Sequence, residues 1–251
     1  MIDSNQRPVA LVTGSATGVG RACAVQFAGL EYDVVVNYSR SEDDARETVR
    51  LVEEQGAKAL LVACDVSDDA AVRGMIDRIE REFGRLDVVV NNAGTTFFIE
   101  HADLEALTEE KWDRILGVNL KGPFFVARAA TPLLKSSPHA AIVNVSSVAG
   151  VSGTGSSIAY CASKAALNAM TKSLARALAP EIRVNAVCPG PIDTRWMRGW
   201  RTADEIEEMV AAYPIPRAAQ PEDIAETVCY LAAGTSLTTG QCLIVDGGRT
   251  M

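Results

Sequence analysis

The stretch Ser146-Ser-Val-Ala-Gly-Val-Ser-Gly-Thr-Gly-Ser-Ser-Ile-Ala-Tyr-Cys-Ala-Ser-Lys164 joins the end of an apolar run to the start of a helix. The apolar residues 141–145 before it predict a buried strand. The glycine- and serine-rich middle predicts a loop, and Ser156 or Ser157 can cap the helix that follows. The stretch therefore predicts a strand, a loop and a helix in immediate succession.

Three side chains of this stretch can act on one substrate atom. Tyr160 and Lys164 are four residues apart, so they share a face of the helix. A neighbouring ammonium favours the phenolate and lowers a tyrosine pKa that is ordinarily about 10. Ser147, at the carboxyl end of the strand, can direct its hydroxyl to the same place. Because a Tyr-x-x-x-Lys pair alone is more often a solvated pair on a helix surface, the rest of the chain must decide between the two interpretations.

The length and charge of the chain limit its functional class. With 251 residues and 48% hydrophobic content, it can bury the core of one domain, which we assign to residues 1–251. The net charge of −8 argues against nucleic acid or an anionic membrane as a partner. No apolar run approaches the roughly 18 residues of a membrane span, and the N-terminus lacks a signal-peptide pattern. We therefore expect a cytoplasmic protein.

The cysteines are scattered and form no Cys-x-x-Cys motif. With only His101 and His139 beside them, no metal-ligand cluster is visible in the sequence. We therefore expect reduced thiols and no structural metal. The six cysteines are Cys23, Cys64, Cys161, Cys188, Cys229 and Cys242.

Short apolar strands alternate with amphipathic helices along the chain. This order is typical of a parallel sheet that is covered by helices on both faces. No repeat, low-complexity tract or flexible linker interrupts it, so we place no domain boundary. The expected strands are 9–12, 34–36, 59–62, 88–90, 141–145 and 182–187, and the expected helices are 21–30, 42–55, 68–83, 109–134 and the one that continues past Lys164 to about 179.

The first turn between a strand and a helix is rich in glycine. Gly14, Gly18 and Gly20 lack the Cβ atoms that would keep a pyrophosphate away from the backbone, and the helix N-terminus offers free N–H groups. The other interpretation is an ordinary tight turn. The strand–turn–helix context favours nucleotide binding, with the spacing Gly-x-x-x-Gly-x-Gly.

Motifs over essentially the whole chain resemble those of the classical short-chain dehydrogenases/reductases. The late segments 221–225 and 240–248 look most like the 3-oxoacyl-carrier-protein reductase branch. The resemblance implies an α/β fold, namely a single-domain Rossmann fold with a doubly wound parallel seven-stranded sheet and helices on both faces. The motifs are Thr13-Gly14-Ser-Ala-Thr-Gly18-Val-Gly20, Asn91-Asn92-Ala93-Gly94, Asn119, Ser147, Tyr160-x-x-x-Lys164 and Pro189-Gly190.

The resemblance also implies which residues contact a nicotinamide cofactor. Asp65 is either a partner of the adenine amino group or a helix cap. Asn91 is either beside the ribose, bracing the sheet, or part of a simple turn. The segment from Cys188 to Thr194 is a structural turn in the other interpretation. The implied contacts are Gly14, Ser15, Thr17, Gly18, Val19, Gly20, Asn37, Tyr38, Ser39, Arg40, Asp65, Val66, Asn91, Ala93, Gly94, Tyr160, Lys164, Pro189, Gly190, Ile192 and Thr194.

Four catalytic roles follow from the same resemblance. Tyr160 is the proton donor, and Ser147 hydrogen-bonds the reacting oxygen. Lys164 lowers the tyrosine pKa and contacts the nicotinamide ribose. Asn119 lies inside the long helix 109–134, where asparagine has poor intrinsic propensity. It is either a tolerated surface residue or, as we favour, the centre of a helix distortion that holds a water connecting Lys164 to solvent.

The segment 195–213 resembles the variable substrate lid of the family. We expect Trp196 and Trp200 to contact the substrate, together with Phe97 and Ser147, although these rings could equally pack the lid down. The arginines of the segment could meet an anionic group. We favour a solvated face on which they pair with nearby acids. The arginines are Arg195, Arg198 and Arg201, and the acids are Asp204, Glu205, Glu207 and Glu208.

The end of the second strand bears on cofactor choice. No acid stands at Asn37 or Tyr38 to bind a ribose 2′-hydroxyl and repel a 2′-phosphate. Arg40 offers a charged partner for that phosphate, and Ser39 can add a hydroxyl. Thr17 stands where many relatives that use NADP carry a basic residue. In the other interpretation Arg40 pairs with Glu42 or Asp43. We expect NADP(H) to be preferred, with NAD(H) second.

The sequence therefore predicts an NADP(H)-dependent oxidoreductase that interconverts a carbonyl and a secondary alcohol by hydride transfer. The expected partner is a small-molecule substrate, and the resemblance implies a homotetramer. The first alternative is a 3-oxoacyl-acyl-carrier-protein reductase. Against it, the sites where such enzymes dock an acidic carrier on basic residues read Ser136-Ser137-Pro138 and Pro180-Glu181. The second alternative is a catalytically silent nucleotide sensor, which would need no proton donor.

Overall fold

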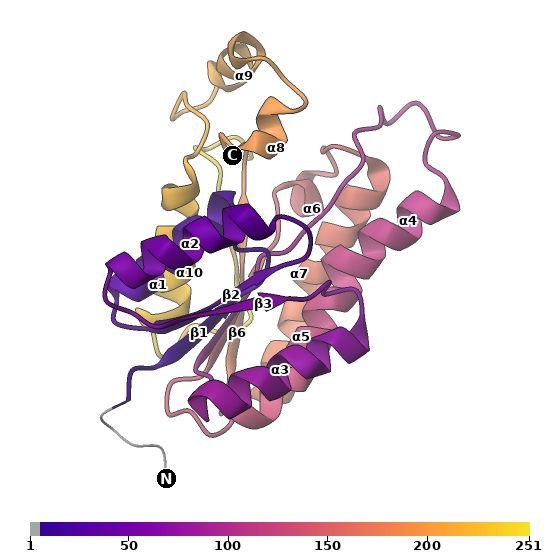
Figure 1. Cartoon of the computed structure of the whole chain (residues 1–251). Coiled ribbons are helices and arrows are strands. Elements are labelled where there is room, and N and C mark those ends of the chain that lie inside the picture. The colour runs from indigo at the N-terminus through magenta and orange to yellow at the C-terminus, as the bar shows by residue number, and fades with distance from the viewer. Residues whose placement is uncertain (1–5) are drawn as a thin grey trace.

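A computed structural model describes residues 6–251, so the first five residues of the predicted domain lie outside the described part. Within that part, seven parallel strands form one sheet in the order β3-β2-β1-β4-β5-β6-β7. This arrangement confirms the predicted doubly wound sheet (Figure 1). The strands are β1 Val9–Val12, β2 Asp33–Tyr38, β3 Ala59–Ala63, β4 Val88–Asn91, β5 Ala141–Val145, β6 Arg183–Pro189 and β7 Cys242–Val245.

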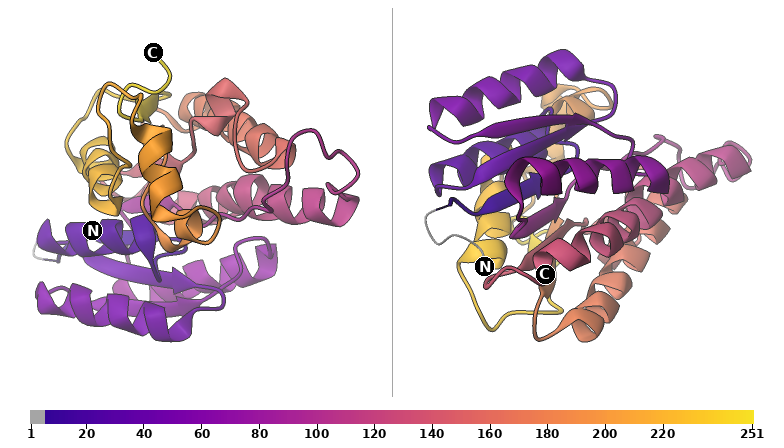
Figure 2. Two further views of the ribbon diagram at one scale, coloured as in Figure 1. Left: turned by 90° about the horizontal axis from the view of Figure 1, so that it is seen from above. Right: turned by 60° about the horizontal axis from the view of Figure 1, so that its bottom comes forward.

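Successive side chains of a strand point to opposite faces of the sheet. Both faces are buried because helices cover each of them. In β1, Ala10 and Val12 belong to one apolar cluster, with residues of the helices α1, α2 and α10. Val9 and Leu11 belong to the other, with residues of α3, α5 and α7. Figure 2 shows these two helical layers on either side of the sheet. The helices are α1 Gly18–Gly29, α2 Glu42–Glu54, α3 Asp69–Phe83, α5 Gly122–Leu134, α7 Ile158–Leu178 and α10 Pro221–Ala233.

The long helix expected over 109–134 is divided. It begins as α4 (Glu109–Leu116), continues as a π-helical segment η1 (Gly117–Lys121), and ends as α5. A π-helical turn inserts one residue into the helical repeat and is frequent at functional sites. The distortion predicted around Asn119 is therefore present, and Asn119 itself is fully buried rather than on the surface.

The remaining helices lie near the carboxyl ends of the strands. α6 (Ala149–Ser152) follows β5, and α8 (Arg195–Arg198) and α9 (Ala203–Val210) follow β6. In Figure 1 α8 and α9 project beyond the sheet, above its carboxyl edge. They rest on a small apolar cluster of Ile206, Val210 and Ala218, which is separate from the two main clusters. The segment 195–213 thus has its own local support.

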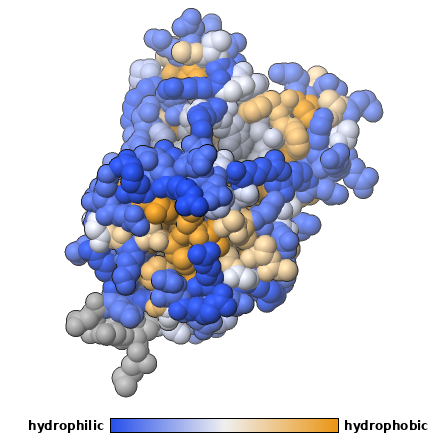
Figure 3. Space-filling view, viewed as in Figure 1, coloured by the Kyte–Doolittle hydropathy of each residue, from blue (hydrophilic) through white to orange (hydrophobic). Residues whose placement is uncertain are grey.

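The surface is mostly hydrophilic on the face shown in Figure 3. An apolar area lies over the edge strand β3, between the hydrophilic outer sides of α2 and α3. Within residues 6–251, no helix has the length and hydropathy needed to cross a membrane. The cysteines of this part of the chain are all free thiols.

Candidate active site

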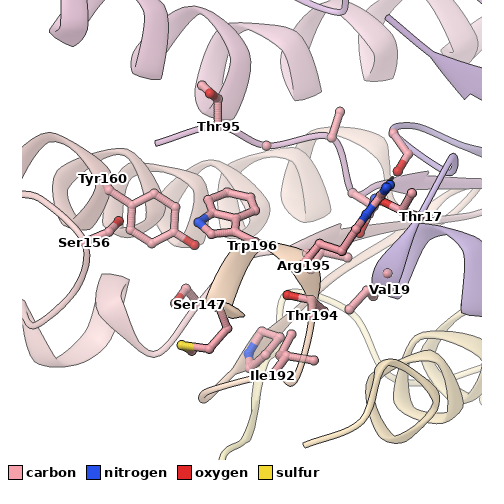
Figure 4. A pocket seen from close by; sticks show the side chains of 18 of the residues that line it. Thr17, Val19, Thr95, Ser147, Ser156, Tyr160, Ile192, Thr194, Arg195 and Trp196 are labelled. Atoms are coloured by element: carbon pink, nitrogen blue, oxygen red, sulfur yellow. Dashed lines mark hydrogen bonds between the residues drawn. The ribbon is translucent and has the colours of Figure 1, made fainter. Parts of the chain in front are cut away.

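A cavity of about 970 Å³ opens at the carboxyl ends of the central strands. The strand order reverses there, since β1 lies between β2 on one side and β4 on the other. Ligands of open α/β sheets bind at such a switch point. Figure 4 shows Tyr160 and Ser147 pointing into the cavity beside Trp196, and Arg195 extending toward Thr17. Sequence segments far apart therefore line one space.

The glycine-rich turn packs so closely against its neighbours that two of its positions have no room for a side chain. Gly14 has a φ of +61°, and a Cβ there would lie 2.8 Å from the Cα of Ala93. A Cβ on Gly20 would lie 2.5 Å from both the side-chain nitrogen of Asn92 and the Gly14 carbonyl. Only glycine fits at either position without a shift of the backbone.

Two buried polar residues fix this turn from beneath. The Ser15 hydroxyl donates to the Val12 carbonyl at 2.8 Å and accepts from the Asn37 N–H at 3.0 Å. The Asn37 side chain accepts from the Gly14 N–H at 3.0 Å and donates to the Cys64 carbonyl at 3.1 Å. Ser15 is expected from the resemblance to contact the cofactor, yet it lies behind the turn, outside the cavity wall.

The N-terminus of α1 faces the cavity. Thr17, the residue before α1, makes no side-chain hydrogen bond to the first turn, and Thr17, Gly18 and Val19 all line the cavity. The first N–H groups of a helix have no partner within the helix and carry a partial positive charge. Together with the glycine turn, they fit the pyrophosphate of a dinucleotide.

Asp65 lies on the cavity wall after β3, but its carboxylate already has protein partners. It accepts from the N–H and hydroxyl of Ser67 at 3.0 and 2.7 Å, and from Arg114 at 2.9 Å. Burial by itself would raise the Asp65 pKa, but these hydrogen bonds hold it below its usual value. The cap of α3 is Asp68, which accepts from two N–H groups of the first turn, so the capping interpretation of Asp65 is wrong.

Ser157 caps α7, as one of the two predicted candidates, and accepts from the Tyr160 N–H at 3.2 Å. Lys164, one turn further along, is buried and donates from Nζ to the Val145 carbonyl at 2.8 Å. Its Nζ lies 5.7 Å from the centre of the Tyr160 ring. Burial lowers the Lys164 pKa to about 8. The Tyr160 and Lys164 side chains therefore face the same space, as their spacing predicts.

The Tyr160 pKa differs from the expectation. Burial raises it to about 12, and a hydrogen bond with Ser147 offsets only part of the shift. Desolvation of the phenol therefore outweighs the Ser147 hydrogen bond, and the Lys164 ammonium is engaged by the Val145 carbonyl. The phenol therefore keeps its proton across the neutral range, which suits a proton donor.

Asn119 lies behind the cavity wall and joins two segments. Its side-chain oxygen accepts from the Thr95 N–H at 2.8 Å, and its nitrogen donates to the Thr95 carbonyl at 2.9 Å and the Ser163 hydroxyl at 3.1 Å. Both amide hydrogens are thereby used. The side chain holds the loop after β4 against α7, which carries Tyr160 and Lys164.

Asn91 is also placed behind the wall. Its side-chain nitrogen donates to the Asn144 oxygen at 2.9 Å, and both residues are buried in the paired strands β4 and β5. The predicted bracing of the central sheet is therefore seen. Asn91 does not itself line the cavity described here.

The other side of the cavity is aromatic. The Trp196 ring meets the Tyr160 ring edge-on, with centres 6.2 Å apart. The Trp200 ring stacks on Phe98 with centres 4.9 Å apart and planes inclined by 18°. Phe98, not the expected Phe97, lines the cavity, and the Phe97 ring lies under Lys111 instead. Adjacent residues of an extended loop point in different directions, so the sequence could not distinguish the two.

The arginines of the segment 195–213 do not pair with the acids of that segment, contrary to the favoured prediction. Arg195 forms an ion pair with Asp44 of α2 at 2.8 Å. Arg198 binds Asp193 through two hydrogen bonds of 2.7 and 2.8 Å. Arg201 stacks on the Trp200 ring. The acids Asp44 and Asp193 lie outside the segment, because α8 packs toward α2 and the end of β6.

Most of the expected cofactor and substrate residues line this cavity. One exception not yet described is Gly20, which packs beneath the turn. The expected residues that do not line the cavity are Ser15, Gly20, Asn91, Phe97 and Asn119. Sequence reasoning missed other lining residues that have no motif of their own. They include Thr95, Phe98, Arg114, Ser156 and Arg249. No group of side chains in residues 6–251 is arranged to hold a metal ion.

Comparisons with known proteins agree with this geometry. A family model described as enoyl-(acyl carrier protein) reductase matches residues 14–250. The chain is 45% identical over 247 residues to a Streptomyces violaceoruber protein named as ketoacyl reductase 2 of the granaticin polyketide synthase, covering 98% of this chain and 97% of that one. It is 39% identical over 245 residues to a 3-oxoacyl-[acyl-carrier-protein] reductase of Staphylococcus aureus, covering 96% and 98%.

A solved structure of a short-chain dehydrogenase/reductase from Burkholderia xenovorans superimposes with a TM-score of 0.92, at 38% identity and 98% coverage of both chains. Sequence and structure thus agree over nearly the full length. The chain belongs to the short-chain dehydrogenase/reductase family and resembles its 3-oxoacyl-acyl-carrier-protein reductase branch, and it is an oxidoreductase of CH–OH groups that uses a nicotinamide cofactor.

Proposed function

We propose that this enzyme interconverts a small-molecule carbonyl compound and a secondary alcohol with NADP(H). One observation carries the proposal. Tyr160, Ser147 and Lys164 open into the same cavity as the uncapped N-terminus of α1. A proton donor and a pyrophosphate site are therefore parts of one binding space.

The chain's own residues supply the proton chemistry. A bound nicotinamide would supply the hydride, whose chemistry belongs to the cofactor. Tyr160 donates its proton to the developing alkoxide, and Ser147 hydrogen-bonds the same oxygen. Since the Tyr160 pKa is raised to about 12, the donor is protonated at any physiological pH. Lys164, held by the Val145 carbonyl, places a positive charge beside the phenol as its proton leaves.

Asn119 acts in this proposal by position. With both amide hydrogens of its side chain used by Thr95 and Ser163, its oxygen atoms, including the main-chain carbonyl within η1, are left to hold a water for Lys164. The π-helical geometry supports this role, because it interrupts the regular hydrogen-bond ladder of the helix.

NADP(H) is favoured by the corner of the cavity beyond β2. Ser39 and Arg40 line it, and Asn37 is used by the glycine turn. Arg40 makes no ion pair within residues 6–251, since Glu42 binds Arg46. This guanidinium is thus available for a 2′-phosphate, which it can bind through paired hydrogen bonds.

The second candidate is a 3-oxoacyl-acyl-carrier-protein reductase, which the Staphylococcus aureus relative favours by its name. Against it, Ser136-Ser137-Pro138 and Pro180-Glu181 carry no lysine or arginine, and the loop between α5 and β5 offers only Lys135 to attract an acidic carrier. The proposal therefore keeps the small-molecule substrate first.

A hydride-transfer assay separates these candidates. Oxidation of NADPH is followed at 340 nm with a panel of free ketones and with a 3-oxoacyl thioester, offered on its carrier protein and on a short thiol. We expect turnover of free ketones and no gain from the carrier. A gain of tenfold or more from the carrier would favour the second candidate, and no turnover of any carbonyl would overturn both.

We also propose a homotetramer. Leu243 and Ile244 of the edge strand β7 are about two-fifths exposed, and so is Phe124 on α5. Large apolar side chains on an unpaired strand edge favour association with another copy. Light scattering at micromolar concentration should give four times the mass of one chain, and a monomer would contradict this part of the proposal.

A further inference from the structure

Arg201 is a cation of the cavity wall without a protein partner. Its Nε is buried and has no hydrogen-bond partner, and no carboxylate of residues 6–251 is within ion-pair distance. The other two arginines of the segment, Arg195 and Arg198, are paired with Asp44 and Asp193. Arg201 therefore differs from Arg195, which also lines the cavity, in having no acidic partner, and from Arg198 in lining the cavity at all.

The nearest candidate acid is already occupied. The Arg201 charge contributes to lowering the pKa of Glu205, after larger effects from the N–H and hydroxyl of Thr202. That carboxylate caps α9, where it accepts from the Thr202 N–H at 2.7 Å. Moving it to Arg201 would break its hydrogen bond to the Thr202 N–H in the capping box.

The backbone and an aromatic ring hold Arg201 in place. Its N–H donates to the Met197 carbonyl at 2.9 Å, at the end of α8, and the next residue begins the capping box of α9. The guanidinium carbon lies 4.3 Å from the centre of the Trp200 ring, which in turn stacks on Phe98. Stacking fixes a guanidinium by its face and leaves the N–H groups of its edge free for an anion.

A buried charged N–H without an acceptor costs free energy that a bound anion would recover. The chain carries a net charge of −8, yet none of the carboxylates in residues 6–251 pairs with Arg201. We propose that Arg201, with Trp200 and Phe98, is an anion subsite of the substrate pocket, so the substrate bears a carboxylate or phosphate besides its carbonyl. The inference rests on the proposed function.

Substrate orientation follows from this arrangement. The carbonyl oxygen lies at Tyr160 and Ser147, the apolar body lies along Trp196 and Trp200, and the anionic group meets Arg201. Trp196 contacts the Tyr160 ring, so the aromatic wall connects the reacting end to the anion subsite.

Binding of unreactive probes tests the subsite without turnover. Affinities of the full chain for benzoate, phenyl phosphate and the neutral analogue benzamide are measured by calorimetry. At least one anion should bind about tenfold more tightly than benzamide, and the tighter of the two identifies the carboxylate or phosphate. Arg201→Gln should weaken that anion roughly 10- to 100-fold, the size of a charged hydrogen bond, and leave benzamide unchanged. Arg201→Lys, which keeps the charge but loses the planar fork, should recover part of the loss.

Arg198→Gln is the matched control, because it removes the same charge from the same segment outside the cavity wall. Equal losses in the two glutamine variants would overturn the proposal, as would anions that bind no better than benzamide. NADPH affinity should be unchanged in Arg201→Gln. A tenfold loss there, with anion binding intact, would assign Arg201 to the cofactor instead.

Steady-state turnover provides a second test of the anion subsite. 4-Oxocyclohexanecarboxylate and its methyl ester differ in one charge, and the wild type should favour the acid in kcat/KM by about tenfold, a preference lost in Arg201→Gln. If neither ketone reacts while the probes bind as expected, the proposed function fails and the subsite stands. Suppose instead that the acid and the ester react at equal rates in the wild type and in Arg201→Gln, and that the anions bind no better than benzamide. The subsite then fails and the proposed function stands.

Discussion

The two halves of the cavity are built in different ways. Around the glycine turn, the wall is main chain held by buried side chains such as Ser15 and Asn37. Across from it, the wall is a set of side chains on α8 and α9, which rest on a cluster of three buried residues. α8 itself buries none of its residues. The contrast separates a rigid half, which in the proposed function binds the cofactor, from a locally supported half, which binds the substrate.

The difference has a physical basis. Backbone groups and glycines at a sheet edge keep their positions because the whole core supports them. A short segment with few buried contacts depends on its own residues, and its side chains can change without disturbing the sheet. We therefore expect the rigid half to carry the chemistry that the family shares, and the half on α8 and α9 to determine which substrate is bound.

The largest effect should come from the rigid half. Tyr160→Phe keeps the ring beside Trp196 and removes the proton donor, so turnover should fall by about 10²–10⁴-fold, as for loss of general acid catalysis. Cofactor affinity should be nearly unchanged. Steady-state rates with a good ketone, and a fluorescence titration with NADPH, provide the measurement. Near-normal rates would show that another group donates the proton.

Cofactor choice tests the same half at its outer corner. Arg40→Ala should weaken NADPH binding by ~1.5–3 kcal/mol, the loss of a charged hydrogen bond, because the 2′-phosphate loses its cation. NADH, which lacks that phosphate, serves as the control and should bind as before. The measurement is the dissociation constant of each cofactor for the wild type and for Arg40→Ala. Equal losses, or a wild type that prefers NADH, would contradict the NADP(H) proposal.

A pair of glycine substitutions compares the two halves directly. Gly20→Ala forces a Cβ to within 2.5 Å of the Gly14 carbonyl, so the free energy of unfolding should fall by about 1–3 kcal/mol, as for overpacking. Gly199→Ala in the substrate half meets its nearest atom at 3.3 Å, and its change should stay within about 0.5 kcal/mol. Urea unfolding of both variants provides the comparison, and similar losses would remove the distinction.

The pH dependence should report Lys164. Its pKa is lowered to about 8, so the ammonium is present below that pH and is lost above it. The kcat/KM for NADPH, which reports groups of the free enzyme, should be flat below pH 8 and fall up to tenfold per unit above it. Tyr160, with a pKa near 12, stays protonated over this range. A profile that remains flat to pH 10 would show that the charge on Lys164 is not required.

The smallest effect is expected at Cys161, which follows the proton donor. An adjacent position on a helix points about 100° away, and the thiol is buried against the loop, 2.9 Å from where a Cβ on Gly155 would lie. Burial also raises its pKa, so the thiol is not activated. Cys161→Ala should change kcat by less than about twofold and leave its pH profile intact. An altered profile would show that the thiol takes part in the reaction.

Several features could be predicted from the sequence because their causes are local. The strand over 9–12 and the helix starting at Glu42 appear where expected. The cap at Ser157 also appears, since a serine before an apolar run accepts from the first turn. The break at Asn119 was implied by the family resemblance, in keeping with the poor helix propensity of asparagine. Each signal acts over a few residues.

Other features depended on distant contacts. The Tyr160 pKa is raised instead of lowered, because burial is a property of the packed chain. Phe98 replaces Phe97 at the cavity because the path of the loop after β4 is held by Asn119. Arg195 reaches Asp44, which precedes it by 151 residues. Neither the hydrophobic periodicity nor the spacing of motifs in the sequence shows which distant residues will be in contact.

The sequence by itself determined the order of strands and helices, the glycine turn, and the spacing of Tyr160 and Lys164, because alternation and helical repeat act between near neighbours. Only the tertiary structure decided which side chains share the cavity and which charges are paired. Those depend on how α8 packs toward α2 at the edge of the sheet, where Arg195 meets Asp44. Burial and charge pairing are set by the whole chain at once, and that is why Arg201 could be recognised as an unpaired cation only after folding.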